Sequence, residues 1–206
     1  MGERREDFKV EEVASELLRV FEERILPRLL NITDESKRYL LFAGWLNTFL
    51  EERGMGRIII TGGFAVEIYT GRVYRTMDVD VIVEGDVRIV ESFLAGFSER
   101  IGRGFLPIYD VLSLKSIDIV STVYNRGKPP VKILVEEYHV YLDPVEDLIA
   151  IYLDGWKNWG STEDRDKAIW LMATWANKLD FEYLEEICRN RRVVDKLVEL
   201  KQLLSM

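Results

Sequence analysis

The pattern Asp78-Val79-Asp80 places two carboxylates two residues apart at the start of a β-branched run. Side chains alternate between the faces of a strand, so Asp78 and Asp80 are expected on one face and Val79 and Val81 in the core. Two carboxylates on one face resist ionising together unless a cation lies between them. Mg²⁺ binds hard oxygen ligands, often one or two carboxylates together with substrate phosphates. The spacing therefore predicts a Mg²⁺ (or Mn²⁺) site at Asp78 and Asp80.

A third carboxylate is needed to hold a second metal ion or to serve as a general base. Asp118 is the only acidic residue in the strand-like run of residues 115–120. Its apolar neighbours are expected to face the core, which leaves Asp118 on the opposite face if this strand lies beside the Asp78 strand. The central hypothesis is that Asp78, Asp80 and Asp118 converge as metal ligands and catalytic residues.

Paired glycines, Gly62 and Gly63, follow the β-branched run of residues 58–60 and precede a short amphipathic stretch. Glycine permits positive φ and close approach of the backbone, so N–H groups at the start of the following helix can face an anion. The sequence thus predicts a phosphate and its metal in one pocket.

In this order, Gly62-Gly63, Asp78-Val79-Asp80 and a later strand aspartate resemble the nucleotidyltransferase (DNA polymerase β-like) superfamily. The combination of Gly62-Gly63-x-Ala65 with Arg75-Thr76-x-Asp78-x-Asp80 looks closest to its small prokaryotic nucleotidyltransferase-like proteins, which include toxin–antitoxin-type members. The resemblance extends more loosely to Pro144-Val145-Glu146-Asp147-Leu148 and to Arg165-Asp166-Lys167. Tyr152 stands where such families carry a lysine, and Ala168 stands at their last acidic position.

The resemblance implies transfer of a nucleoside monophosphate from an NTP to an acceptor, with release of pyrophosphate. Asp78 and Asp80 would hold the metal that bridges the triphosphate, and Asp118 would help a second metal lower the pKa of the acceptor hydroxyl. The resemblance also assigns nucleotide binding to six residues. They are Thr61, Gly62, Gly63, Arg75, Arg165 and Lys167.

Two functions stay open. The first is a Mg²⁺-dependent nucleotidyltransferase whose acceptor is RNA, protein or a small molecule. The second is a catalytically silent protein of the same fold that serves as a binding or regulatory partner, such as half of a toxin–antitoxin pair. Tyr152 favours the silent protein, whereas the three aspartates favour the enzyme. A partner protein or a homodimer is compatible with either.

Composition sets further bounds. With 206 residues, 48% of them hydrophobic, the chain can bury a sizeable core. Its net charge of −8 argues against nonspecific binding to nucleic acid.

Cys188 is the only cysteine and is expected in the core, so no intramolecular disulfide forms. No apolar signal region or membrane-spanning stretch stands out, which makes the cytoplasm the expected compartment. A single glutamine, Gln202, and 31% charged residues are compatible with a thermophilic source.

The expected fold class is α/β (α+β), with a nucleotidyltransferase-type mixed sheet flanked by an N-terminal helical pair and a C-terminal helical bundle. The corresponding divisions are residues 1–54, 55–142 and 143–206. The apolar stripe of residues 10–30 predicts a helix that closes near Pro27 to Asn31, and Thr33 or Asp34 is expected to cap a second helix ending near Gly54. Asp86 is expected to cap a helix that runs to about Ile101.

Overall fold

A computed structural model describes the backbone of residues 2–206 and the side chains from Phe8 onward. Its contacts divide the chain into two compact units. The first, here called the sheet unit, comprises Met1–Ile60, Met77–Asn125 and Lys132–Leu142. The second, here called the helical unit, comprises Thr61–Thr76, Arg126–Val131 and Asp143–Met206. Among the described residues, no helix is both long and apolar enough to cross a membrane.

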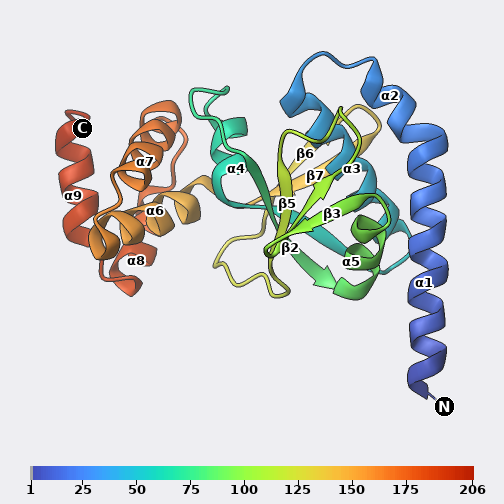
Figure 1. The fold of residues 1–206 in the computed structure, drawn as a ribbon. Helices are drawn as coiled ribbons and strands as arrows, with labels where there is room; N and C mark the ends of the chain where they lie inside the picture. Colours follow the sequence, from blue (N-terminus) through green and yellow to red (C-terminus); the bar gives the residue numbers. More distant parts are fainter. Residues whose placement is uncertain (1) are drawn as a thin grey trace. The chain divides into compact units, whose positions relative to one another are not determined.

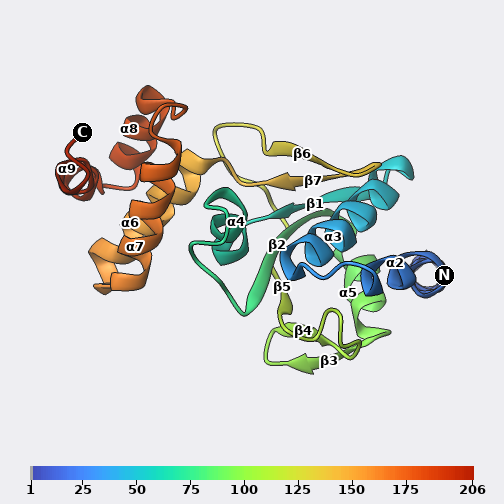
Figure 2. The same ribbon diagram turned by 90° about the horizontal axis from the view of Figure 1, so that it is seen from above.

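The described strands form one mixed sheet (Figure 1), and its strand order is β3-β4-β5-β2-β1-β7-β6, as the labels of Figure 2 show. Strand β2 is antiparallel to β1 and parallel to β5, β1 is parallel to β7, and β4 is antiparallel to both β3 and β5. This arrangement confirms the predicted mixed-sheet fold class. The strands are β1 (Gly56–Ile60), β2 (Asp78–Gly85), β3 (Ser98–Ile101), β4 (Gly104–Pro107), β5 (Ser116–Ser121), β6 (Val131–Val135) and β7 (Tyr138–Leu142).

One face of this sheet is apolar and covered by helices. Val79 and Val81 on β2 and Ile117 on β5 are buried, as the two-residue period of a strand requires when that face is covered. Helix α3 (Glu35–Glu52) packs on β1 and β7, and α5 (Val87–Ala95) packs on β2 (Figure 2). Covering this face leaves the even-numbered side chains of β2 and β5 on the other face.

The N-terminal helical segment does not stop at Pro27. α1 (Gly2–Val20) continues through the π-helical turn η1 (Phe21–Ile25) into α2 (Leu26–Leu30). Proline lacks an N–H and its ring collides with the carbonyl four residues earlier, and a wider π turn is one way for a helix to accommodate it. The helical segment ends at Leu30, within the predicted range of Pro27 to Asn31, but it contains a π turn where a regular helix was expected.

Aspartate caps begin two helices of the sheet unit: Asp86 as predicted, and Asp34 as one of the two predicted candidates, Thr33 and Asp34. The Asp34 side chain accepts a hydrogen bond from the Lys37 N–H at the start of α3, and Asp86 accepts one from the Arg88 N–H at the start of α5. The predicted extension of the helix capped by Asp86 to Ile101 is wrong: this helix, α5, ends at Ala95, and residues 98–107 form the β3–β4 hairpin. Pairing with β4 and a turn at Gly102, whose φ is 60°, override the helical pattern there.

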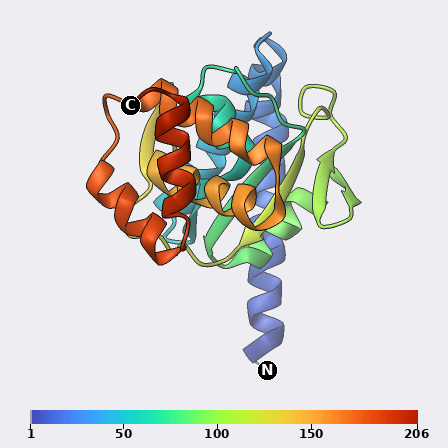
Figure 3. The ribbon, with the colours of Figure 1, turned by 90° about the vertical axis from the view of Figure 1, so that its left-hand side faces the viewer.

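The helical unit has its own core. Its four C-terminal helices, coloured from amber-orange to red, pack against one another, with α6 in contact with α7, α8 and α9 (Figure 3). Cys188 is fully buried in this core, as predicted, and burial raises the pKa of its thiol to about 12. The helices are α4 (Gly62–Tyr69), α6 (Val145–Trp159), α7 (Thr162–Trp175), α8 (Phe181–Asn190) and α9 (Val194–Leu203).

Candidate metal centre

Three carboxylates meet on the sheet face opposite α3 and α5. Parallel pairing of β2 with β5 places Asp78 beside Ser116 and Asp80 beside Asp118. Because residues that pair directly project on the same face, Asp118 joins the two aspartates of β2. Ligand oxygens from Asp78, Asp80 and Asp118 lie within 4.8 Å of one another, and all three residues are half-buried. The structure thus brings together the three aspartates singled out in the sequence.

The electrostatics of Asp118 reflect this crowding. Burial raises the pKa of Asp118, the nearby charge of Asp78 raises it further, and a hydrogen bond from Ser116 lowers it in part. The Oδ1 atom of Asp118 is buried and has no hydrogen-bond partner among the described residues. A buried acceptor left without a donor costs about 1–3 kcal/mol. One buried carboxylate oxygen of the site therefore has no hydrogen-bond donor among the described residues.

These residues fit a divalent cation. Three carboxylates supply the hard oxygen ligands that Mg²⁺ prefers, and a cation would remove the repulsion between Asp78 and Asp118. It would also give a partner to a buried oxygen that has none among the described side chains.

The glycine turn predicted to bind phosphate lies in the helical unit, where α4 begins directly after Thr61. Gly62 has a φ of 61°, a conformation that favours glycine, whereas Gly63 is close-packed. A Cβ at Gly63 would lie 2.9 Å from Thr76 Oγ1. The Thr61 hydroxyl donates to the buried carboxylate of Asp143. Gly63 and the Thr61 side chain thus have packing and hydrogen-bonding partners of their own.

The basic residues predicted to bind nucleotide also lie in the helical unit. Lys167 on α7 pairs with Glu163 at 2.9 Å, and its Nζ lies 4.8 Å and 5.1 Å from the ring centres of Tyr74 and Tyr152. An ammonium group therefore stands beside position 152, although the residue there is tyrosine. Arg165 pairs with its neighbour Asp166 at 2.8 Å. Arg75 is exposed in the segment before β2.

Two buried acids that sequence reasoning did not single out organise the helical unit. Glu67 is fully buried on α4 and accepts a hydrogen bond from the Thr76 N–H at 3.2 Å. Asp143, also fully buried, pairs with Arg126 at 2.9 Å. The signal available for Glu67 was an acid inside an apolar helical stretch, which is rarely buried without a partner.

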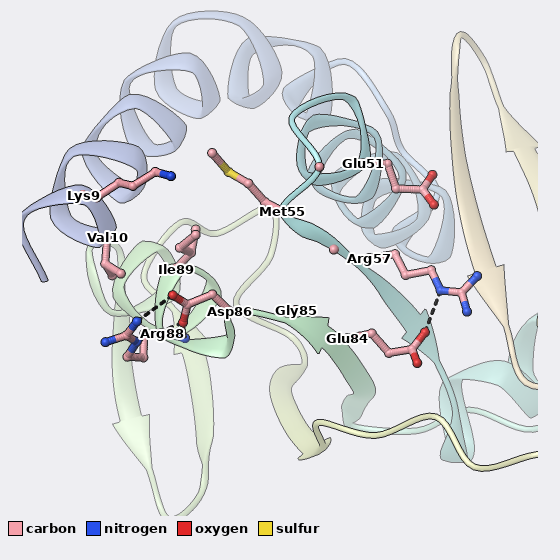
Figure 4. A pocket seen from close by; sticks show the side chains of 12 residues that line it. Lys9, Val10, Glu51, Met55, Arg57, Glu84, Gly85, Asp86, Arg88 and Ile89 are labelled. Carbon is pink, nitrogen blue, oxygen red and sulfur yellow. Dashed lines mark hydrogen bonds and ion pairs between the residues drawn. The ribbon is translucent and has the colours of Figure 1, made fainter. Parts of the chain in front are cut away.

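A hollow of about 890 Å³ lies at the other end of β2, lined in part by Lys9, Met55 and Gly85. Its charged walls are mostly paired (Figure 4): Arg57 with Glu84 at 2.7 Å, and Arg88 with Asp86 at 2.8 Å. Asp80 and Gly85 are five residues apart on one strand, which corresponds to about 16 Å. The hollow is therefore separate from the carboxylate cluster.

No protein-family model matches the sequence, and no curated protein sequence matches it. Among solved structures, a nucleotidyltransferase-like protein from Paracoccidioides brasiliensis is 15% identical, with 82% of this chain and 93% of that chain covered and a TM-score of 0.54.

Two structures of the antibiotic-resistance factor ANT(2″)-Ia are each 18% identical. The solution structure covers 78% of this chain and 94% of that chain, with a TM-score of 0.46. The complex with adenylyl-2″-tobramycin covers 75% and 95%, with a TM-score of 0.48. Of these three structures, the nucleotidyltransferase-like protein has the highest TM-score with this chain. The chain has a nucleotidyltransferase-like fold, as its glycine and aspartate motifs predict.

Proposed function

We propose that this protein is a Mg²⁺-dependent nucleotidyltransferase that moves a nucleoside monophosphate from an NTP to an acceptor. The observation that carries the proposal is the convergence of Asp78, Asp80 and Asp118, with one buried oxygen of Asp118 lacking a hydrogen-bond partner. A nucleotidyltransferase-like fold gives this cluster its context, although fold alone does not establish activity. Mn²⁺ is the expected substitute for Mg²⁺ because it accepts similar oxygen ligands.

In this proposal Asp78, Asp80 and Asp118 hold the divalent metal. When bound, the metal would supply Lewis-acid stabilisation of phosphate charge and a template for the reacting groups. The raised pKa of Asp118 makes protons compete with a metal for this carboxyl more strongly than they do at an ordinary aspartate. The carboxyl of Asp118 would have to be deprotonated to serve as a ligand, so metal binding should strengthen as the pH rises.

The nucleotide-binding residues are proposed on the resemblance and on local chemistry. Backbone N–H groups at the start of α4, after Gly62, are suited to an anion, as helix N-termini generally are. Arg75, Arg165 and Lys167 provide cationic side chains. The ammonium of Lys167 beside the Tyr152 ring supports a role for this lysine where Tyr152 replaces the expected one.

A catalytically silent protein of the same fold is the second candidate function, as a regulatory partner or as half of a toxin–antitoxin pair. The observation that favours it is Tyr152, whose side chain is buried and carries no positive charge. Under this reading the fold binds a partner protein rather than turning over an NTP.

Incubation with each of the four labelled NTPs, Mg²⁺ or Mn²⁺ and cell extract separates the two candidates. The enzyme is expected to transfer label from one or more NTPs to RNA, protein or a small molecule, and chelation of the metal should stop the transfer. Asp80→Asn is the control, because it removes one ligand with little change in size. Absence of metal-dependent nucleotide binding and of transfer with all four NTPs would reject the enzyme in favour of the silent protein.

A further inference from the structure

The carboxylate of Asp118 lies over a glycine on the neighbouring strand. β4 and β5 are antiparallel with Phe105 paired to Ile117, a register that sets Gly104 opposite Asp118. Directly opposed residues of an antiparallel pair project on the same face, with Cβ atoms about 4.5–5.5 Å apart. A side chain at position 104 would therefore project beside the Asp118 carboxylate.

The space for such a side chain is already filled. A Cβ at Gly104 would lie 1.8 Å from Asp118 Oδ1, 3.0 Å from Asp118 Cγ and 3.3 Å from Ser116 Cβ. Gly104 is buried, and its φ is outside the left-handed region in which several other glycines of this chain lie. The backbone would therefore accept alanine here, and the obstacle to it is the carboxylate itself.

We propose that Gly104 is a positioning residue of the metal centre, which keeps open the space that the Asp118 carboxylate occupies. Ser116 donates a hydrogen bond to this carboxylate, but its Oδ1 atom accepts none from the described residues, so packing has to hold that oxygen in place. The expected effect on metal binding rests on the proposed function, whereas the contact between Gly104 and Asp118 follows from the geometry alone.

Alanine at position 104 is expected to weaken metal binding without unfolding the protein. The atom that an alanine Cβ would displace is the end of a short side chain rather than backbone, so Asp118 is expected to swing away while the strands stay paired. Alanine also loses less backbone entropy than glycine on folding, which offsets part of the cost. The expected defect is thus a misplaced ligand in a folded protein.

The first test is Mn²⁺ binding to the Gly104→Ala variant, measured by calorimetry and by the electron paramagnetic resonance signal of free Mn²⁺. Affinity is expected to fall at least tenfold, and the melting temperature in metal-free buffer is expected to change by only a few degrees. Glu99→Ala is the control, because Glu99 is exposed on β3 of the same hairpin and should leave Mn²⁺ affinity unchanged. Wild-type affinity in Gly104→Ala would overturn the proposal.

The second test needs no metal and compares the effect of Gly104→Ala in two backgrounds. With Asp118 present, the substitution should lower the melting temperature; in the Asp118→Ala background the vacated space accepts the methyl group, and it should be neutral or stabilising. Residues in contact give such non-additive effects, whereas independent sites add. Equal shifts in both backgrounds would overturn the positioning role. If the wild-type protein binds no Mn²⁺, the proposed function fails, whereas the comparison of the two backgrounds still tests the contact between Gly104 and Asp118.

Discussion

Charged side chains lie at both ends of β2, but opposite charges pair at one end and like charges lie together at the other. At the Gly85 end, Arg57 pairs with Glu84 and Arg88 pairs with Asp86, so opposite charges meet around a hollow. At the other end, Asp78, Asp80 and Asp118 bring like charges together. The first arrangement is satisfied by the protein alone, whereas the second leaves Asp118 Oδ1 without a partner among the described residues.

This difference identifies the carboxylate end as the better candidate for chemistry, although a large hollow lies at the other. A perturbed carboxyl held beside a like charge indicates a functional site more specifically than volume does. Paired surface charges such as Arg57 and Glu84, each about one-third exposed at 33% and 32%, are common and contribute little. Four predictions test the contrast, in order of decreasing effect.

The largest effect is expected on catalysis. Asp78→Asn should lower nucleotidyl transfer by more than about a hundredfold, because loss of an outer-sphere partner of a metal ligand already costs 10–100-fold. Asp86→Asn is the matched control at the other end of β2, since asparagine caps a helix about as well as aspartate. Initial rates of label transfer measure both. Equal loss of activity in both variants would contradict the proposed difference between the two ends of β2.

Metal should stabilise the protein through the carboxylate end only. Mg²⁺ at a hundred times its dissociation constant is expected to add about 2.7 kcal/mol to the free energy of unfolding. For a chain of this size the gain corresponds to a rise of roughly 5–10 °C in melting temperature. Differential scanning calorimetry with Mg²⁺, and after chelation, measures the shift. Asp86→Asn should keep it and Asp78→Asn should lose it; a shift retained in Asp78→Asn would place the metal elsewhere.

The raised pKa of Asp118 predicts two pH dependences. Protons compete with metal for this carboxyl, so Mn²⁺ affinity should rise with pH, by about tenfold per unit below the raised pKa. In metal-free protein, Asp118 contributes stability that is fully present below its unfolded pKa of about 3.8 and is lost as pH rises through the raised folded pKa. Calorimetric titrations with Mn²⁺ over a pH series check the first, and denaturant unfolding of the wild type and Asp118→Asn checks the second. Mn²⁺ affinity independent of pH would contradict the raised pKa.

The smallest effects, in metal-free buffer, should differ in sign between the two ends. Asp78→Asn is expected to preserve stability or raise it by a few tenths of a kcal/mol, because it removes a charge that opposes ionisation of Asp118. Glu84→Gln should lower stability by about 0.5 kcal/mol through loss of its pair with Arg57. Urea unfolding measures both changes. A loss of stability in Asp78→Asn would indicate a structural rather than a functional carboxylate.

Local features of the fold were predictable because they depend on neighbours in sequence. Asp34 and Asp86 cap helices through side chains that reach N–H groups two or three residues ahead. The end of α5 was not predictable, since the helical pattern of residues 96–101 yields to pairing with β4. Tertiary contacts of this kind routinely override local propensity.

For the candidate site, the sequence by itself determined that Asp78 and Asp80 share a face, because a strand repeats every two residues. It also marked Asp118 as an acid within an apolar strand. Only the tertiary structure decided that β5 lies parallel to β2 in the register that pairs Asp80 with Asp118, and that Gly104 on β4 leaves room for this carboxylate. Strand order and register depend on which apolar faces pack together across the whole unit, and no local spacing encodes that choice.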